Sequence, residues 1–306
     1  MREDVLIATI RQLLAQEPLA DEILVVDQTV EHEAATRDAL AEWERTGKIR
    51  WIRHSPANLP SARNRAVEET VCDVILFIDD DVQMQNNLVG SHLRNYSDTS
   101  IAAVAGRVLD PNSMTPEEVR PSWPKVMDCR CLAMDSSVRL EDIAAVKGGN
   151  HSARVDWIKR IGGYDENYVG WAFREDSDLA IRLWKAGGRV VYDPEASLVH
   201  LGVSTGGCRR KDSQRKLPEW QQSFPASYFA VRHLFPTRWF WRDALILNVR
   251  KFIFRKDNAY HPWRLPWAVG AYVYGLIKAV KLSYAFAGNH LRLQGTKSGG
   301  ERADET

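Results

Sequence analysis

The chain has 306 residues, of which 44% are hydrophobic and 26% are charged, and its formal net charge at pH 7 is +1. These values are typical of an ordinary globular protein of one large or two modest domains, and they exclude a strongly acidic or basic chain. The small net charge hides an uneven distribution, because residues 207–264 hold 13 Lys and Arg against 4 Asp and Glu. A basic partner-binding surface is therefore expected only in the C-terminal part.

Cysteine spacing and hydrophobic patterning exclude further classes. The four cysteines show no CxxC spacing and no neighbouring His cluster, so neither structural zinc nor disulfide bonds are expected. No charged and then apolar signal segment opens the chain, which predicts a cytoplasmic protein. The longest charge-free stretch near the C-terminus, 265–277, has 13 residues, whereas about 20 are needed to span a bilayer. We expect a chain that can lie on a membrane but not cross it.

In chain order, short apolar strands alternate with helices. Strands are expected at 23–26, 48–53, 74–78, 101–106 and 189–192, and helices at 5–16, 38–45 and 61–70. This alternation predicts an α/β fold with a mostly parallel sheet covered by helices on both faces. Four prolines between residues 110 and 124 predict a long loop there.

The strand expected at 74–78 ends directly in three carboxylates, Asp79, Asp80 and Asp81. An apolar run of this length suits a strand buried on both faces, and ligands of such folds bind beyond the carboxyl ends of the strands. Three adjacent anions repel one another, so a cation is expected beside them, and a few hard oxygen ligands favour Mg²⁺ or Mn²⁺. Taken alone, the triplet is equally compatible with a solvated turn, since Asp is common in turns.

Two further polar clusters lie beyond the expected long loop. The segment Glu-Asp-Ser-Asp at 175–178 leads into a helix with an apolar stripe, which stops at Gly187 and Gly188. Its acidic residues are compatible with a catalytic role. More commonly, such residues cap the first turn of a helix and interact favourably with the helix dipole. Residues 192–200 read as a strand, a turn and a short apolar run that ends in His200. A single His is more often a hydrogen-bonded structural residue than a ligand.

The order of these clusters carries a family resemblance. It rests on the motifs EILVVDQT (22–29), ARN (62–64), FIDDDV (77–82), KGGN (147–150), IGGYDE (161–166) and EDSDL (175–179), followed by His200. Over residues 3–202 this order resembles the family 2 glycosyltransferases, which have the GT-A fold. Each motif is weak alone, but six of them in the family's order are specific. The resemblance implies a Rossmann-like GT-A domain. Beyond it, the residues themselves predict a C-terminal helical extension that is basic and aromatic.

The resemblance implies a role for each candidate site residue. Asp27 would contact the nucleotide base or ribose, and Arg63 would lie near the diphosphate, whose oxygens a guanidinium can bind in a bidentate manner. Asp81 and His200 would ligate Mn²⁺ or Mg²⁺, together with Asp79, which also faces the nucleotide. The nucleotide-sugar-binding residues are then Asp27, Arg63, Asp79, Asp80, Gly148, Gly149 and Asn150.

The implied activity is the transfer of a sugar from a nucleoside-diphosphate sugar to a hydroxyl group, with inversion. The attacking hydroxyl must lose a proton, and a carboxylate is the natural base, for which Asp176 is the first choice and Glu175 the second. A glycan or a lipid-linked acceptor is expected, in cell-envelope or extracellular polysaccharide synthesis. A metal-dependent phosphohydrolase also places DxD after a strand, but Gln83 stands where such enzymes have Thr or Val.

One departure from the family pattern concerns the N-terminus. Family members place a strand before the first helix, whereas this chain begins at that helix, so two strand edges without partners are expected. We hypothesise that the start codon is assigned downstream of the true one. The alternative is a non-catalytic relic that binds a nucleotide sugar without turning it over.

The expected domains are residues 1–205 for the glycosyltransferase, 206–290 for a helical region, and 291–306 for a disordered tail. The helical region interleaves aromatic with basic residues, which suits the surface of an anionic membrane. A helical subdomain packed on the catalytic core, or a dimer contact, is the competing interpretation. No RNA-reading motif is present, so nucleic acid is not an expected partner. The expected location is cytoplasmic, peripheral on the inner face of the membrane.

Overall fold

The computed structural model describes residues 2–109, 111, 137–203, 219–237, 240–242, 246, 248–254, 258 and 260–297, with backbone alone for residues 2, 219 and 284–297. The chain divides into two compact units, Met1–Ser213 and Gln214–Thr306. The expected domain boundary at 205/206 and most of the expected loop at 110–124 lie outside the described residues. The domain limits therefore stay a prediction.

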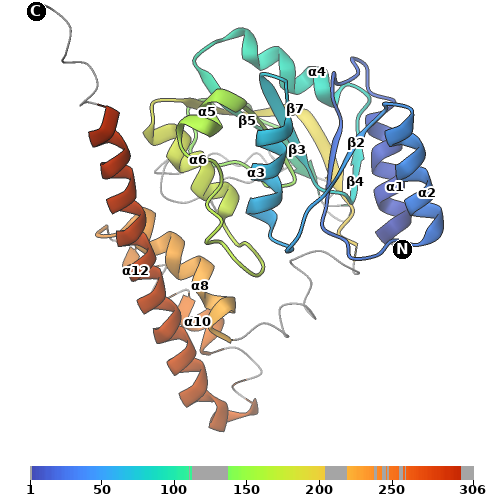
Figure 1. Ribbon diagram of the computed structural model, residues 1–306. Coiled ribbons are helices and arrows are strands. Elements are labelled where there is room, and N and C mark those ends of the chain that lie inside the picture. The colour runs from blue at the N-terminus through green and yellow to red at the C-terminus, as the bar shows by residue number, and fades with distance from the viewer. Residues whose placement is uncertain are drawn as a thin grey trace, which may run out of the picture. The chain divides into compact units, whose positions relative to one another are not determined.

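The N-terminal unit is an α/β structure with two sheets (Figure 1). Its strands are β1 (Leu24–Asp27), β2 (Arg50–Arg53), β3 (Val74–Ile78), β4 (Val82–Met84), β5 (Ile101–Leu109), β6 (Asn150–Arg154) and β7 (Arg189–His200). Its helices are α1 (Arg2–Leu13), α2 (Ala34–Arg45), α3 (Leu59–Glu69), α4 (Leu88–Leu93), α5 (Val155–Arg160) and α6 (Glu175–Lys185), with a 3₁₀ turn η1 at Arg94–Ser97. The helices flank the sheets, so the predicted α/β fold class is confirmed.

The main sheet is mixed rather than mostly parallel. Its order is β3-β6-β5-β7-β4, and only the β5–β7 pair in it is parallel, while β1 and β2 form a separate parallel pair. The difference comes from β6 and β4, which the apolar pattern does not reveal. The first three residues of β6, Asn150, His151 and Ser152, are polar yet fully buried. They are tolerated there because neighbouring groups satisfy their hydrogen bonds.

Four strands, β1, β2, β3 and β4, pair on one side only within the described part of the chain. Among the described residues, β1 pairs only with β2, and β3 pairs only with β6. These are two edges of the kind that the sequence predicts. The apolar residues Leu24 and Val26 of β1 still pack against the same core cluster as Phe77 of β3. Side-chain packing, rather than a backbone ladder, therefore joins the two sheets here.

Helix α1 covers the outer edge of β4. The side-chain amide of Gln12 donates to the Val82 carbonyl at 3.2 Å and accepts from the Met84 N–H at 2.8 Å. One turn away, the Thr9 hydroxyl donates to the Asp80 carbonyl at 2.9 Å. The two side chains share one face of α1, because they are three residues apart. They satisfy backbone groups that an edge strand would otherwise leave open, and they hold the chain beside the carboxylate triplet.

The C-terminal unit is helical, as the sequence predicts. It contains α8 (Glu219–Phe229), a π-helical turn η2 (Ala230–Leu234), α10 (Asn248–Phe252), a 3₁₀ turn η4 (Pro262–Arg264) and α12 (Leu265–Lys297). Helix α12 continues seven residues into the segment predicted to be a disordered tail, and residues 298–306 lie outside the described residues. In the described part of the chain, no helix is both long enough and apolar enough to cross a membrane.

Candidate active site

Asp79, Asp81 and His200 lie together and are called the Asp/His cluster below. One ligand atom from each residue lies within 4.8 Å of the others. His200 Nε2 is 3.3 Å from Asp81 Oδ1 and 3.6 Å from Asp79 Oδ2. The strands explain the proximity, because the last residue of β7, His200, is paired with Val82 of β4, directly after Asp81. Two segments that are distant in sequence thus bring together three side chains of types that can bind a metal ion.

The electrostatics of the Asp/His cluster favour a cation. The hydrogen bond to Asp81 raises the pKa of His200 above its ordinary value, against the effect of burial, and the charges of both carboxylates add to this rise. Asp81 is buried, and its second carboxylate oxygen accepts the Val203 N–H at 3.0 Å, whereas Asp79 and His200 are 36% and 40% exposed. Carboxylate oxygens with one imidazole fit Mn²⁺, and less well Mg²⁺.

The pair Gly148 and Gly149 connects this cluster to the second acidic motif. A Cβ on Gly149 would collide with the carboxylate of Asp79. A Cβ on Gly148 would lie 2.9 Å from Arg63 Nη2 and 3.2 Å from Asp176 Oδ2, both tighter than ordinary contact. Only glycine allows the backbone to come this close. Asp79 and Asp176 therefore contact two adjacent residues of one short segment.

Arg63 and Glu175 form a buried ion pair behind this glycine pair. Arg63 Nη1 lies 2.5 Å from Glu175 Oε1, and the exposed fractions of the two side chains are 7% and 0%. Burial alone would lower the pKa of Arg63, but the charges of Glu175 and its neighbours raise it above the ordinary value. Arg63 Nη2 also donates to the Gly148 carbonyl at 2.9 Å. The buried ion pair thus contacts the glycine pair through the hydrogen bond from Arg63 to the Gly148 carbonyl.

Asp176 differs from Glu175 in its access to solvent, because it is partly exposed. Its Oδ2 accepts the Gly148 N–H at 2.8 Å, and its Oδ1 accepts the Ser177 N–H at 2.7 Å. The loop before α6 is strained, since Ala172 and Arg174 have φ values of 48° and 70°, a region that non-glycine residues rarely occupy. This strained segment immediately precedes α6, of which Asp176 is the second residue.

The carboxylate of Asp27 is surrounded by donors. Its oxygens accept hydrogen bonds from the Thr29 N–H, His32 Nε2, Trp51 Nε1 and Arg53 Nη1, at 2.8 to 3.0 Å. Burial would raise the pKa of Asp27, but these hydrogen bonds lower it below the ordinary value. Sequence reasoning did not find the last three donors. The signal for Trp51 and Arg53 is the parallel pairing of β1 with β2, which sets Asp27 beside Arg53, whereas His32 follows Asp27 by five residues in the same segment.

Three more predicted or neighbouring residues complete the site. The side chain of Asn150 is fully buried and donates to the carbonyls of Arg107 and Ala196, both at 2.9 Å, so it joins β6 to β5 and β7. Asp80 is partly exposed beside the Asp/His cluster. Lys147, to which the sequence assigned no role, is exposed, and its charge lowers the pKa of His200. A cationic side chain therefore lies near the Asp/His cluster.

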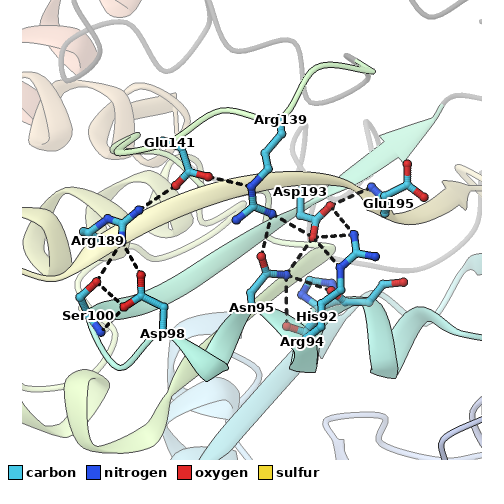
Figure 2. A network of polar contacts seen from close by, with 11 residues as sticks. His92, Arg94, Asn95, Asp98, Ser100, Arg139, Glu141, Arg189, Asp193 and Glu195 are labelled. Atoms are coloured by element: carbon cyan, nitrogen blue, oxygen red, sulfur yellow. Dashed lines mark hydrogen bonds and ion pairs between the residues drawn. The ribbon is translucent and has the colours of Figure 1, made fainter.

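A polar network fixes β7 upstream of His200 (Figure 2). The buried carboxylate of Asp193 accepts hydrogen bonds from Arg94 and Asn95 of η1, and Arg139 lies 3.2 Å from it. Burial would raise the pKa of Asp193, but these donors lower it. Figure 2 also shows Arg189 between Asp98 and Glu141. The network joins β7, η1 and the segment after residue 137.

Comparisons with known sequences agree on the class of protein. Residues 1–158 match the sequence profile of glycosyl transferase family 2, and residues 132–200 match that of the N-terminal domain of galactosyltransferase. A pre-mycofactocin glycosyltransferase from Mycobacterium tuberculosis is 26% identical over 195 residues, which cover 60% of this chain and 38% of that protein. The succinoglycan biosynthesis protein ExoA from Rhizobium meliloti is 34% identical over 91 residues, covering 25% and 27% of the two chains. The match thus spans well under half the length of these relatives.

A solved structure shares the fold. The mannosyltransferase PcManGT from Pyrobaculum calidifontis, in complex with GDP-Man and Mn²⁺, aligns with 95% of this chain and 76% of its own. The TM-score is 0.52 and the sequence identity is 14%. At this identity the likeness establishes the fold, which is that of the GT-A glycosyltransferases.

Proposed function

The chain belongs to the family 2 glycosyl transferases, and from this premise we propose that it transfers a sugar from a nucleoside-diphosphate sugar to a hydroxyl group with inversion at the anomeric carbon. We place this activity in residues 1–205. The acceptor is a glycan or a lipid-linked saccharide. One observation carries the proposal: Asp79 of the Asp/His cluster and Asp176 contact the adjacent residues Gly149 and Gly148.

Asp79, Asp81 and His200 are the residues that would hold Mn²⁺ or Mg²⁺. Such an ion offsets the negative charge that develops on the departing nucleoside diphosphate. Lys147 adds a second cationic group on the exposed side of the cluster. The diphosphate of the donor is then expected between these groups and the glycine pair. PcManGT, which shares the fold, is a mannosyltransferase whose complex holds Mn²⁺ and a nucleotide sugar.

Asp176 is the general base in this proposal. Its partly exposed carboxylate takes the proton of the acceptor hydroxyl while the hydroxyl oxygen bonds to the anomeric carbon. The bond between that carbon and the phosphate oxygen breaks in the same displacement, and its electron pair leaves with the nucleoside diphosphate. Attack and departure on opposite faces invert the configuration. Asp176 then releases its proton to solvent, so the step balances without a covalent intermediate.

Glu175 and Arg63 take roles different from those expected from the sequence, which were second-choice base for Glu175 and contact with the diphosphate for Arg63. Glu175 is fully buried against Arg63, so we assign both residues to positioning the glycine pair. Asp27, with its neighbour Trp51, is proposed to form the nucleotide side of the donor site. Here Trp51 offers an indole ring on which a base can stack.

The acceptor class and the location of the protein are also part of the proposal. ExoA, one of the matched relatives, is a succinoglycan biosynthesis protein, which supports a role in cell-envelope or extracellular polysaccharide synthesis. Glycan assembly on lipid-linked intermediates occurs at a membrane surface. We therefore propose that the protein acts on the inner face of the cytoplasmic membrane, on an anionic surface.

The decisive assay measures the release of nucleoside diphosphate from UDP-, GDP- and dTDP-sugars in the presence of Mn²⁺, with glycan and lipid-linked acceptors. We expect one donor to be turned over, and Asp81→Asn and Asp176→Asn to reduce the rate by at least a hundredfold. Asp21→Asn, which removes an exposed carboxylate remote in sequence from the motifs, is the matched control and keeps the rate.

Two outcomes would overturn the proposal. Binding of a nucleotide sugar without turnover of any donor identifies the non-catalytic relic. Release of phosphate from simple phosphomonoesters identifies the phosphohydrolase, an alternative that the match to glycosyl transferase family 2 leaves without support.

A further inference from the structure

Helix α12 presents a long apolar face to solvent. Between residues 267 and 280 the exposed side chains include Trp267 at 79%, Tyr274 at 54% and Ile277 at 50%. Val273 and Val280 lie on the same side of the helix and are also exposed. With 3.6 residues per turn, these positions fall on one broad face, called the α12 face below. Contiguous exposed apolar surfaces commonly mark sites of interaction with a protein or a membrane.

The opposite side of α12 is packed, which fixes the orientation of the helix within its unit. Ala268, Tyr272 and Ala279 are at most 5% exposed. A Cβ on Gly275 would lie 3.2 Å from Ser223 Oγ of α8, so the two helices approach closely there. Figure 1 shows α8 and α10 along the same side of α12. The α12 face is therefore the side of the helix opposite the one that packs against α8.

The charge of this unit complements an anionic partner. Helix α12 contains no Asp or Glu over its 33 residues. Residues 219–297 hold 12 Lys and Arg against 3 Asp and Glu, a net charge of +9. Four of these cations, Lys278, Lys281, Arg292 and Lys297, belong to α12 itself, and Lys278 Nζ lies 4.1 Å from the centroid of the Trp220 ring. At 100° per residue, Lys281 lies within the α12 face and Lys278 lies beside it.

We propose that the α12 face docks on a lipid bilayer that carries anionic head groups, with the helix lying along the surface. Apolar side chains between cationic ones, with Trp263 and Trp267 at one end, are the features of helices that lie in the bilayer interface. A second copy of the chain fits less well, since pairing two such faces would bring two charges of +9 together. The inference deepens the proposed function, because a bilayer is where a lipid-linked acceptor resides.

Flotation of the purified chain with vesicles tests this inference. The vesicles contain phosphatidylcholine alone or with 30% phosphatidylglycerol, in 0.1 M and 0.5 M NaCl. We expect binding to the anionic vesicles at 0.1 M salt, with at least a tenfold smaller bound fraction without phosphatidylglycerol and a clear loss at 0.5 M salt. The variant Trp267→Glu with Ile277→Glu should lower the bound fraction at least tenfold.

Val71→Glu is the matched control, because Val71 is an exposed apolar residue of the N-terminal unit, at 88%. It should bind like the wild type, and all variants should melt within a few degrees of it. Nucleoside diphosphate release with a water-soluble acceptor should be unchanged in the double variant, which separates failure of docking from failure of the proposed transfer. Absence of wild-type binding to anionic vesicles overturns the inference. So does a wild-type dimer that the double variant converts to monomer without any vesicle binding.

Discussion

Asp176 and Glu175 are neighbours in the sequence, but their carboxylates face different surroundings. Glu175 is fully buried against Arg63, whereas Asp176 is partly exposed and contacts the Gly148 N–H. The sequence predicts both as acids of one motif and cannot rank them. Their roles depend on which of the two carboxylates pairs with Arg63, a residue more than 100 positions earlier in the sequence.

These surroundings predict opposite effects of removing each charge. Asp176→Asn should lower the turnover rate by about 10²- to 10⁴-fold, the usual contribution of a general base, and destabilise the fold by only about 1 kcal/mol, because the amide keeps one of the two accepting oxygens. Glu175→Gln should instead destabilise the fold by about 3–5 kcal/mol, because Arg63 is left buried without its counter-charge. Urea unfolding and single-turnover kinetics on both variants check this. A stable Glu175→Gln variant would contradict the assignment.

Gly149 gives a prediction about metal binding. In Gly149→Ala the added methyl group meets the carboxylate of Asp79, so this side chain must move and Mn²⁺ should bind at least tenfold more weakly. Gly270→Ala is the control, since a methyl group there meets nothing within 4 Å. Calorimetric titration with Mn²⁺ measures both affinities. Equal affinities in the two variants would show that Asp79 is not needed for the ion.

His32 gives a prediction about pH. Burial would lower the pKa of His32, but hydrogen bonds to Glu3 and Asp27 raise it above 6.5. Because the folded-state pKa exceeds the unfolded value, this stabilisation is complete below about pH 6.5 and is lost as the pH rises through the folded-state pKa. The difference in unfolding free energy between the wild type and His32→Gln should therefore shrink from pH 6 to pH 9. A difference that grows over this range, in urea titrations, would be inconsistent with the assigned contacts.

At the scale of elements, the strands with apolar runs were predictable and those without were not. The range Val74–Ile78 was predicted with its observed bounds, and the ranges of β1 and β2 were close. Strand β6 was missed because Asn150, His151 and Ser152 carry no apolar signal, and their burial depends on partners from other elements. The same holds for the Asp193 network, since Arg94 and Arg139 are remote from it in sequence (Figure 2). A local sequence pattern predicts which apolar side chains are buried. It does not predict which polar side chains are buried with hydrogen-bond partners from other elements.

The cover of β4 by α1 predicts a coupling between this helix and the Asp/His cluster. Gln12→Ala leaves the Met84 N–H without its side-chain acceptor and removes one of the two side-chain donors to the Val82 carbonyl, the other being the Thr9 hydroxyl. This loss should cost about 1–3 kcal/mol of unfolding free energy and weaken Mn²⁺ binding. Arg11→Ala, on the exposed side of the same helix, should change neither quantity. Thermal melting and Mn²⁺ titration of both variants test this. Indistinguishable variants would mean that α1 does not support β4.

At the scale of the whole molecule, the chain consists of two compact units, of which the first carries the proposed chemistry. The family and the fold class could be predicted from the sequence, because six motifs follow one another in the family's order and all of them lie in this first unit. The α12 face could not be predicted from the sequence, because contacts with α8 decide which side of α12 is packed. The roles of the two units can therefore be tested separately.

The central claim is that the Asp/His cluster holds a divalent ion which binds the diphosphate of a nucleotide-sugar donor. Calorimetric binding of UDP, GDP and dTDP to the purified chain, with and without Mn²⁺, tests it most directly. We predict that one nucleotide binds at least tenfold more tightly with Mn²⁺, and that Asp81→Asn abolishes this gain. Nucleotide binding that is unaffected by Mn²⁺, or no binding of any of the three, would contradict the account.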